Sequence, residues 1–154
     1  MNNTLAGQIR DELVFLNYEA EDKNEMLGKI ADWLFERGYV TKEFKRSILE
    51  RERLYPTGMK LDDIQFAIPH TDADYIVNPG VVFIQLKERL EFTQMATFDD
   101  KVYPKVIFLL MMHKDGSQVG LLQDIIGRCT AEGFVASLEE AKTVEEVMSI
   151  IGKE

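Results

Sequence analysis

Histidine and cysteine are scarce in this chain, which has two histidines and one cysteine in 154 residues. A single cysteine excludes an internal disulfide and is typical of a protein from a reducing compartment. A zinc site needs several ligands at suitable spacing, and Cys129 and His113 are isolated, so we expect neither a metal nor a cofactor. The glycine-rich nucleotide loops G-x-G-x-x-G and G-x-x-x-x-G-K are absent, as is the G-x-S-x-G element of serine hydrolases.

Positive charge and long apolar runs are also in short supply. Lys and Arg total 18 against 27 Asp and Glu, which gives a net charge of -9. An acidic surface repels phosphate backbones and anionic lipid, so nucleic acid and membrane surfaces are excluded as partners. Runs such as residues 105–112 are too short to span a membrane, and the N-terminal residues lack a signal-peptide pattern. We therefore expect a cytoplasmic protein without direct membrane insertion.

The apolar patterning predicts one α/β domain over residues 1–154, with no repeat or long linker. Thr41 is the expected N-cap of the second helix. The helix at 117–129 is expected from an apolar stripe of Val119, Leu122, Ile125, Ile126 and Cys129. Strands interleaved with helices predict three layers, and the pattern leaves a parallel and a mixed sheet equally open. The expected strands are residues 13–19, 65–68, 80–87, 90–95 and 105–112, and the expected helices are residues 21–38, 40–54, 117–129, 138–141 and 143–151.

His70 follows Pro69 at the end of the short apolar strand 65–68. Proline has no backbone N–H, so we expect the chain to leave the sheet there. A side chain just past a strand end lies at the rim of an α/β sheet, where functional sites gather. The residues that follow, Thr-Asp-Ala-Asp, are small and polar. They leave the ring open, and His70 is then either a general base or a nucleophile that carries a group covalently.

Arg51 is the second candidate site residue. It lies seven residues after Phe44 and three after Ile48, so its Cα belongs to the predicted buried stripe of its helix. An inward-facing arginine is costly unless an anion pairs with it. Its partner is either an internal carboxylate, from Glu52 or Asp72, or a phosphate held through two hydrogen bonds. The spacing leaves both readings open.

Residues 49–72, LERERLYPTGMKLDDIQFAIPHTD, resemble the active-site region of enzyme IIA of the bacterial phosphoenolpyruvate-dependent sugar phosphotransferase system, fructose/mannitol class. The class pattern is an Arg-Glu pair (51–52), a Thr-Gly turn (57–58) and an A-[aliphatic]-P-H tail (67–70). The longer insertion at 56–63 and the segment at 90–95 look most like the galactitol-specific branch. The resemblance implies a mannitol-type IIA fold, with a mixed sheet of about five strands flanked by helices on both faces, and a stand-alone IIA protein.

The resemblance also implies a function and partners. IIA proteins accept a phosphoryl group from the phosphocarrier HPr on a histidine and pass it to a IIB component, which phosphorylates sugar entering through the IIC permease. Carried over by position, His70 is the phosphorylated nucleophile and Arg51 stabilises the phosphate. Thr71 supplies a flanking hydroxyl. The expected function is thus a phosphotransferase step in galactitol-like uptake.

One position departs from the family pattern. Many members have a second histidine at the start of the late helix, where this chain has Gln118. Gln can donate a hydrogen bond to a phosphate but carries no charge. We expect Gln118 to assist at the site in preference to His113. Two alternatives stay open: a regulatory module of the same fold that acts on a transcriptional regulator or kinase, and a binding domain in which His70 and Arg51 form an internal polar network.

Overall fold

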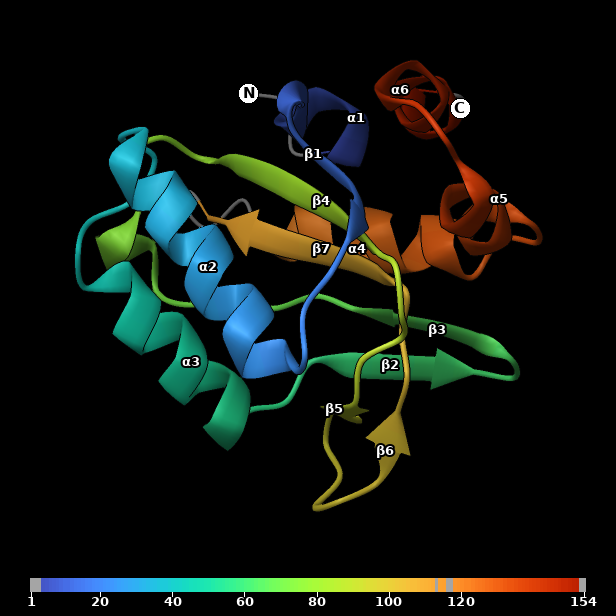
Figure 1. Cartoon of the computed structure of the whole chain (residues 1–154), viewed down its shortest axis with the longest axis horizontal. Coiled ribbons are helices and arrows are strands. Elements are labelled where there is room, and N and C mark those ends of the chain that lie inside the picture. The colour runs from blue at the N-terminus through green and yellow to red at the C-terminus, as the bar shows by residue number, and fades with distance from the viewer. Residues whose placement is uncertain (1–3, 113, 116–117, 153–154) are drawn as a thin grey trace.

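The computed structural model describes residues 4–112, 114–115 and 118–152, without the side chain of Gln118. A five-stranded sheet, ordered β1-β4-β7-β3-β2, runs through the middle of the molecule (Figure 1). A second sheet of two short strands, β5 and β6, lies beside the β2 edge (Figure 1). The strands are β1 (Ile9–Tyr18), β2 (Gly58–Leu61), β3 (Ile64–Ala67), β4 (Gly80–Leu86), β5 (Phe92–Thr93), β6 (Lys101–Val102) and β7 (Val106–Met111).

The main sheet is mixed, which confirms the expected mixed sheet of about five strands. β4 is antiparallel to β7, while β1 is parallel to β4 and β3 is parallel to β7. Every residue of β4 and β7 is buried. Continuous burial is the behaviour of interior strands covered on both faces, and it explains why these two runs are apolar without alternation.

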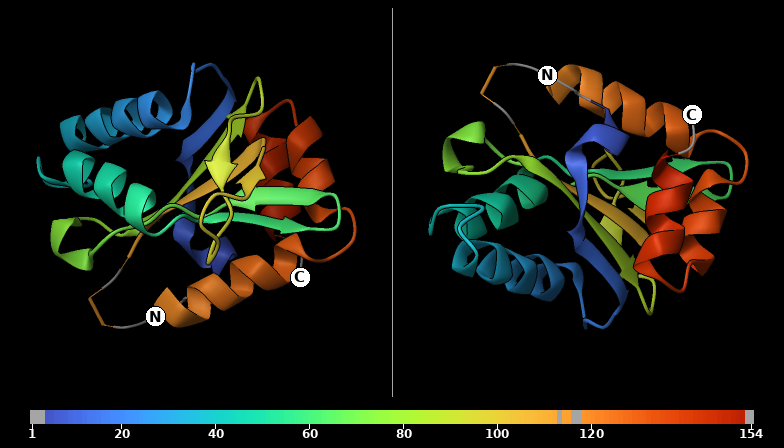
Figure 2. Two further views of the ribbon diagram at one scale, coloured as in Figure 1. Left: turned by 90° about the horizontal axis from the view of Figure 1, so that it is seen from below. Right: turned by 90° about the horizontal axis from the view of Figure 1, so that it is seen from above.

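Helices cover both faces of the sheet (Figure 2). α2 and α3 pack over one face with a core that includes Ile30, Phe44 and Ile48. The other helices bury a second core, in which Ile125 and Cys129 of α4 are fully enclosed. The helices are α1 (Leu5–Gln8), α2 (Lys23–Glu36), α3 (Phe44–Leu54), α4 (Gln118–Cys129), α5 (Phe134–Glu140) and α6 (Val144–Gly152), with a 3₁₀ turn at Ala73–Tyr75. Within the described ranges, no helix has the length and apolarity to cross a membrane.

Two local predictions for the helices are wrong. α3 begins at Phe44 after Glu43, and Thr41 is not its N-cap; the Thr41 hydroxyl is buried with no hydrogen-bond partner among the described residues. The Thr41 carbonyl instead accepts from the Phe44 amide, which tightens the preceding turn. On α4, Val119 is 59% exposed, while Leu121 is buried. Ile125 and Cys129 of the predicted stripe are fully buried, and Leu122 and Ile126 are half-buried, so only Val119 departs from the predicted stripe.

The hairpin of β2 and β3 was predicted only in its second half. The two strands pair antiparallel from Gly58–Ala67 to Leu61–Ile64, which leaves a two-residue turn with Asp62 at φ 56°. Asp tolerates this left-handed conformation better than most residues, so the adjacent aspartates were an available signal. Gly58 is required by close packing: a Cβ there would lie 2.5 Å from a Val102 methyl group.

Candidate functional site

His70 lies beside the C-terminal end of β7. β3 ends at Ala67, as a strand before proline should, yet the chain does not leave the sheet as we expected. The Pro69 carbonyl accepts a 2.9 Å hydrogen bond from the Leu110 amide, and His70 forms a parallel bridge with Leu110. Proline lacks the donor but keeps the acceptor, so one side of the segment can still pair. The pairing fixes the backbone of His70 against an interior strand.

The imidazole of His70 is oriented by the backbone two residues earlier. Its Nδ1 lies 2.7 Å from the carbonyl oxygen of Ile68. A carbonyl can only accept, so Nδ1 carries the proton and donates, and Nε2 is left with its lone pair. Burial lowers the pKa of His70 below 6.5 and the charge of Arg51 lowers it further, against the hydrogen bond to Ile68, which raises it. The ring is therefore neutral at neutral pH, with a nucleophilic Nε2.

His70 and Arg51 line the same open pocket, of about 440 Å³. The two segments come from different parts of the fold, the C-terminal half of α3 and the stretch after β3. Lys114 lines the pocket as well, and so do Asp72 and Asp74. The pocket therefore joins a neutral imidazole and two cations with two carboxylates at its rim.

Arg51 is half-buried and lies beside the buried face of α3. Its guanidinium lies over the ring of Tyr55, with 5.0 Å from Cζ to the ring centroid. No ion pair of Arg51 occurs among the residues that the structure describes, so neither Glu52 nor Asp72 fills the role of internal partner. A guanidinium held over an aromatic ring at a pocket wall keeps its donors available for an anion in that pocket.

Glu52, the residue after Arg51, takes the innermost place on α3. The buried residues of this helix are Phe44, Ile48 and Glu52, at four-residue spacing. Glu52 is 2% exposed and accepts hydrogen bonds from the amide and the hydroxyl of Thr57, at 2.9 and 2.7 Å. Burial raises its pKa from 4.5 to about 7, although the Thr57 hydrogen bonds and the charge of Lys23 lower it. The prediction that Arg51 lies on the buried stripe was thus off by one residue.

Thr71, Gln118 and His113 are the other predicted site residues, and the structure describes the side chain of Thr71 alone among them. Thr71 lines the pocket but is only 5% exposed, and its hydroxyl is hydrogen-bonded to the hydroxyl of Ser47 on α3. Gln118 is the first residue of α4, and Leu122, one turn later, lines the pocket. The side chain of Gln118 and all of His113 lie outside the described residues.

Lys114 was missed by the sequence analysis. It is an exposed residue of the connection between β7 and α4, with no pattern to separate it from other surface lysines.

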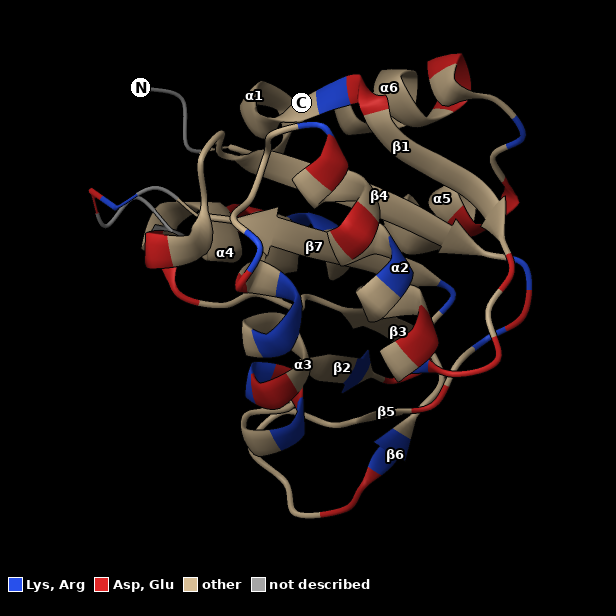
Figure 3. Ribbon diagram, turned by 60° about the vertical axis from the view of Figure 1, so that its left-hand side comes forward, with Lys and Arg blue, Asp and Glu red and all other residues tan. Residues whose placement is uncertain are grey.

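The charged residues around the site are unevenly distributed. α3 carries four basic residues and two acidic ones in an otherwise acidic chain, visible as blue segments along that helix in Figure 3. The site therefore lies beside the most basic helix, which favours an anionic ligand.

The side-chain types that bind metals are spread over the described residues. In the described part of the chain, no group of three or more His, Cys, Asp or Glu side chains is placed to hold a metal ion. Cys129 is fully buried in the core behind the sheet, and burial raises the pKa of its thiol far above the usual value. Cys129 therefore does not contribute to the pocket that His70 and Arg51 line.

Comparison with known proteins is consistent with this chemistry. Transcriptional regulator ManR of Bacillus subtilis is 34% identical over 103 residues, which are 67% of this chain and 14% of ManR. The galactitol-specific EIIA component of Escherichia coli K12 is 25% identical over 117 residues, 76% of this chain and 77% of that protein. The chain thus spans most of the galactitol component but about a seventh of ManR.

Among solved structures, enzyme IIA mannitol of Escherichia coli, in its complex with phosphorylated enzyme IIB mannitol, matches with a TM-score of 0.78 at 22% identity. The match covers 94% of this chain and 97% of that one, and it shows a shared fold. The family model of the phosphoenolpyruvate-dependent sugar phosphotransferase system, EIIA 2, matches residues 8–154. The chain belongs to this EIIA family of phosphotransferase components.

Proposed function

We propose that this protein is a phosphocarrier that receives a phosphoryl group from HPr on His70 and hands it to a IIB component. The observation that carries the proposal is the His70 ring, whose Nδ1 is committed to Ile68 and whose Nε2 is left with a lone pair beside Arg51. A lowered pKa keeps the ring neutral, as a nucleophile requires. The family supplies the reaction class, since its members are phosphotransferase components.

The residues support a simple displacement. The Nε2 lone pair forms a bond to phosphorus as the bond between phosphorus and the donor breaks, and the donor leaves with that electron pair. Nδ1 keeps its proton, which remains hydrogen-bonded to the Ile68 carbonyl. Phosphoryl transfer asks the protein mainly for positioning and charge stabilisation. Passing the group to IIB is the reverse displacement, with His70 as the leaving group.

Arg51 is proposed to stabilise the negative charge of the phosphoryl group, because its guanidinium can donate hydrogen bonds to two phosphoryl oxygens at once. Lys114 adds a second, more exposed cation at the same pocket. Gln118 is proposed to donate an amide hydrogen bond from the start of α4, with His113 as the alternative. Thr71 is proposed to act through its contact with Ser47, because its hydroxyl is buried and already paired.

The proposed process is uptake of a galactitol-like sugar by a IIA component that forms one domain over residues 1–154. The similarity to the galactitol-specific EIIA component over 76% of the chain supports this assignment. The solved complex of IIA mannitol with phosphorylated IIB mannitol supports a IIB protein as acceptor. The IIC permease would then be reached only indirectly, through IIB.

A second candidate function is regulation by phosphorylation of His70. It is supported by the 34% identity to the transcriptional regulator ManR, which exceeds the identity to the galactitol component. In that case the phosphorylated domain would act on a transcriptional regulator or kinase. Transfer from phosphorylated protein to purified IIB distinguishes the two: a carrier loses its label within seconds to minutes, and a regulatory domain keeps it.

The deciding experiment is phosphorylation with phosphoenolpyruvate, enzyme I and HPr, followed by intact-mass spectrometry. A carrier gains one acid-labile phosphate, which fragmentation places on His70. If no adduct forms, His70 and Arg51 belong to an internal polar network without turnover, and the binding-domain alternative is preferred. HPr alone, without phosphoenolpyruvate, is the negative control.

A further inference from the structure

The buried stripe of α3 ends in the carboxylate of Glu52, at a position where an apolar residue would be expected. Phe44 and Ile48 precede Glu52 at four-residue spacing, and all three are buried. Both oxygens of Glu52 are used, Oε2 by the Thr57 amide at 2.9 Å and Oε1 by the Thr57 hydroxyl at 2.7 Å. A buried carboxylate is expensive and adds little net stability, so its presence calls for a reason other than packing.

The hydrogen bonds of Thr57 continue to the histidine. The Thr57 carbonyl accepts from the Ile68 amide at 3.3 Å, and the Ile68 carbonyl accepts from Nδ1 of His70 at 2.7 Å. Glu52 is also the helical neighbour of Arg51. One side chain therefore ties the end of the helix that carries the cation to the segment that orients the imidazole.

We propose that Glu52 is a positioning residue for phosphoryl transfer, which through Thr57 and Ile68 aligns Arg51 with Nε2 of His70. The inference rests on the proposed function of the site. Directional hydrogen bonds fix the turn between α3 and β2 in a way that apolar contact does not, because apolar contact tolerates sliding.

Replacement of Glu52 by leucine, compared with a variant that loses buried hydrogen bonds elsewhere, separates positioning from stability. Leucine completes the apolar stripe at similar volume, but it leaves two buried donors unsatisfied, so we expect a loss of stability like that of the Gln85→Leu control described below. The leucine strands both Thr57 donors, so we expect phosphorylation of His70 to slow by about 10- to 100-fold, the range for a small misplacement of catalytic groups. Glu52→Gln, which can still accept from the Thr57 amide and donate to its hydroxyl, should stay within about threefold of wild type.

The tautomer of His70 gives a readout that does not depend on turnover. ¹⁵N NMR of the imidazole should show the Nδ1–H form in wild type and Glu52→Gln, and a mixture of tautomers in Glu52→Leu. Should Glu52→Leu fail to fold, Thr57→Val tests the same contact, because it removes only the Thr57 hydroxyl. We expect it to slow phosphorylation and to mix the His70 tautomers, and we expect Thr57→Ser, which keeps a hydroxyl, to behave as wild type. If wild type takes no phosphate, the proposed function fails, while the tautomer still tests the positioning role.

Gln85→Leu is the matched control, because it breaks buried hydrogen bonds far from His70. It should lower the melting temperature and leave both the tautomer and the transfer rate within twofold of wild type. The proposal is overturned if folded Glu52→Leu or Thr57→Val keeps the wild-type rate and tautomer. It is equally overturned if Gln85→Leu slows transfer as much as they do, since loss of stability alone would then explain the effect.

Discussion

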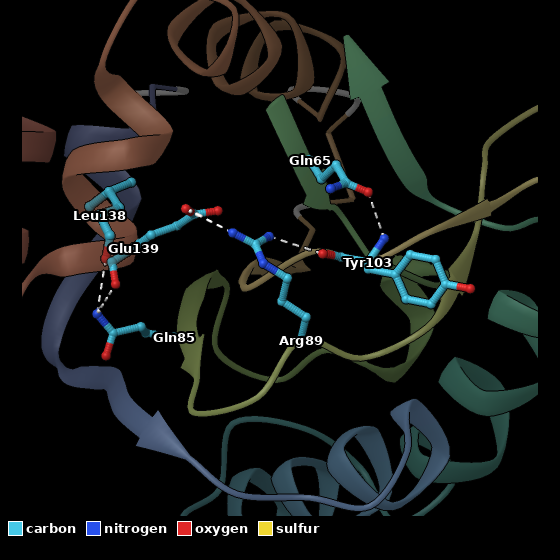
Figure 4. Close-up of polar contacts among 6 residues, drawn as sticks. All are labelled: Gln65, Gln85, Arg89, Tyr103, Leu138 and Glu139. Atoms are coloured by element: carbon cyan, nitrogen blue, oxygen red, sulfur yellow. Dashed lines mark hydrogen bonds and ion pairs between the residues drawn. The ribbon is translucent and has the colours of Figure 1, made fainter. Parts of the chain in front are cut away.

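The polar side chains at the two ends of the central β4–β7 pair differ in their partners: at one end they are hydrogen-bonded within the protein, and at the other they line a pocket. At the end where Gln85 pairs with Val106, the Gln85 amide donates to the carbonyls of Leu138 and Ala141 at 3.0 and 2.7 Å. Its oxygen accepts from the Asn17 amide at 3.1 Å. Figure 4 shows how this amide reaches across to the C-terminal end of α5. Both the nitrogen and the oxygen of the Gln85 side chain therefore have hydrogen-bond partners within the protein.

The arginine at that end is satisfied as well. Arg89 donates to the Glu139 carboxylate and to the Tyr103 carbonyl, both at 3.0 Å, and the amide of Tyr103 donates to Gln65 (Figure 4). These two acceptors hold the Arg89 guanidinium between the Tyr103 carbonyl and α5, so its charge is paired within the protein.

At the other end, where His70 bridges Leu110, the arginine stands over an aromatic ring and a pocket instead. The described residues provide no ion pair for Arg51, and Nε2 of His70 keeps its lone pair. We call the Gln85 end closed because the Gln85 amide and the Arg89 charge are paired within the protein, and the His70 end open because its groups are available to an anion. This contrast can be tested by substitutions at both ends.

The largest effect is expected for His70→Gln. The amide has no nucleophilic nitrogen, so we expect complete loss of the acid-labile adduct in intact-mass spectra while the circular dichroism spectrum stays that of a folded protein. Labelling that persists in this variant would move the phosphorylated residue to His113 and would remove the central feature of the open end.

Arg51 comes next. Loss of its charge in Arg51→Gln should slow phosphorylation about 10²- to 10³-fold, as for other groups that stabilise transition-state charge. Arg51→Lys keeps a point charge without the two-pronged geometry and should lie between that variant and wild type. Quench-flow measurement with phosphorylated HPr gives the rates. A large drop in melting temperature with normal transfer would instead make Arg51 a structural residue.

Glu52 should make stability depend on pH. Its folded-state pKa of about 7 exceeds the unfolded value of 4.5, so the folded state binds more protons between these values. The associated stability is fully present below pH 4.5 and is lost as pH rises through 7, by on the order of 3 kcal/mol. Urea unfolding of wild type and Glu52→Gln at pH 4.5 and 8 isolates this difference, because the His70 contribution cancels. Parallel curves for the two proteins would contradict it.

At the closed end, Gln85→Leu should lower the free energy of unfolding by about 1–3 kcal/mol, the cost of leaving buried partners unsatisfied. Phosphorylation should proceed at the wild-type rate. Urea unfolding and the transfer assay on the same preparation measure both quantities. A slower transfer with unchanged stability would erase the distinction between the two ends.

The smallest effect is expected for Lys114. The residue is exposed, and exposed charges contribute about 0.2–1 kcal/mol, so Lys114→Gln should slow transfer by at most about fivefold. The effect should shrink as salt is added, because salt screens exposed charges. Lys142→Gln, beside the pocket at the Gln85 end, is the control and should show no change. Equal slowing in both variants would indicate a general charge effect.

Much of the fold could be predicted because the decisive information is local. β4 and β7 are continuous apolar runs, and α2 repeats its apolar residues at helical spacing, so each element could be recognised from its own sequence. The β2 half of the hairpin was missed because four residues, two of them exposed, give too short a pattern. The exposure of Val119 was missed because the rotation of α4 about its axis depends on what it packs against.

By itself, the sequence determined most of the longer elements, the α/β class and the motif that points to His70 and Arg51, since periodicity and motif spacing are properties of the chain alone. Only the tertiary structure decided that Glu52, and not Arg51, takes the innermost place on α3. Neighbouring residues on a helix differ by about 100° in direction. The contacts of the folded state therefore choose which one is buried, and they alone bring Arg51, His70 and Lys114 to one pocket.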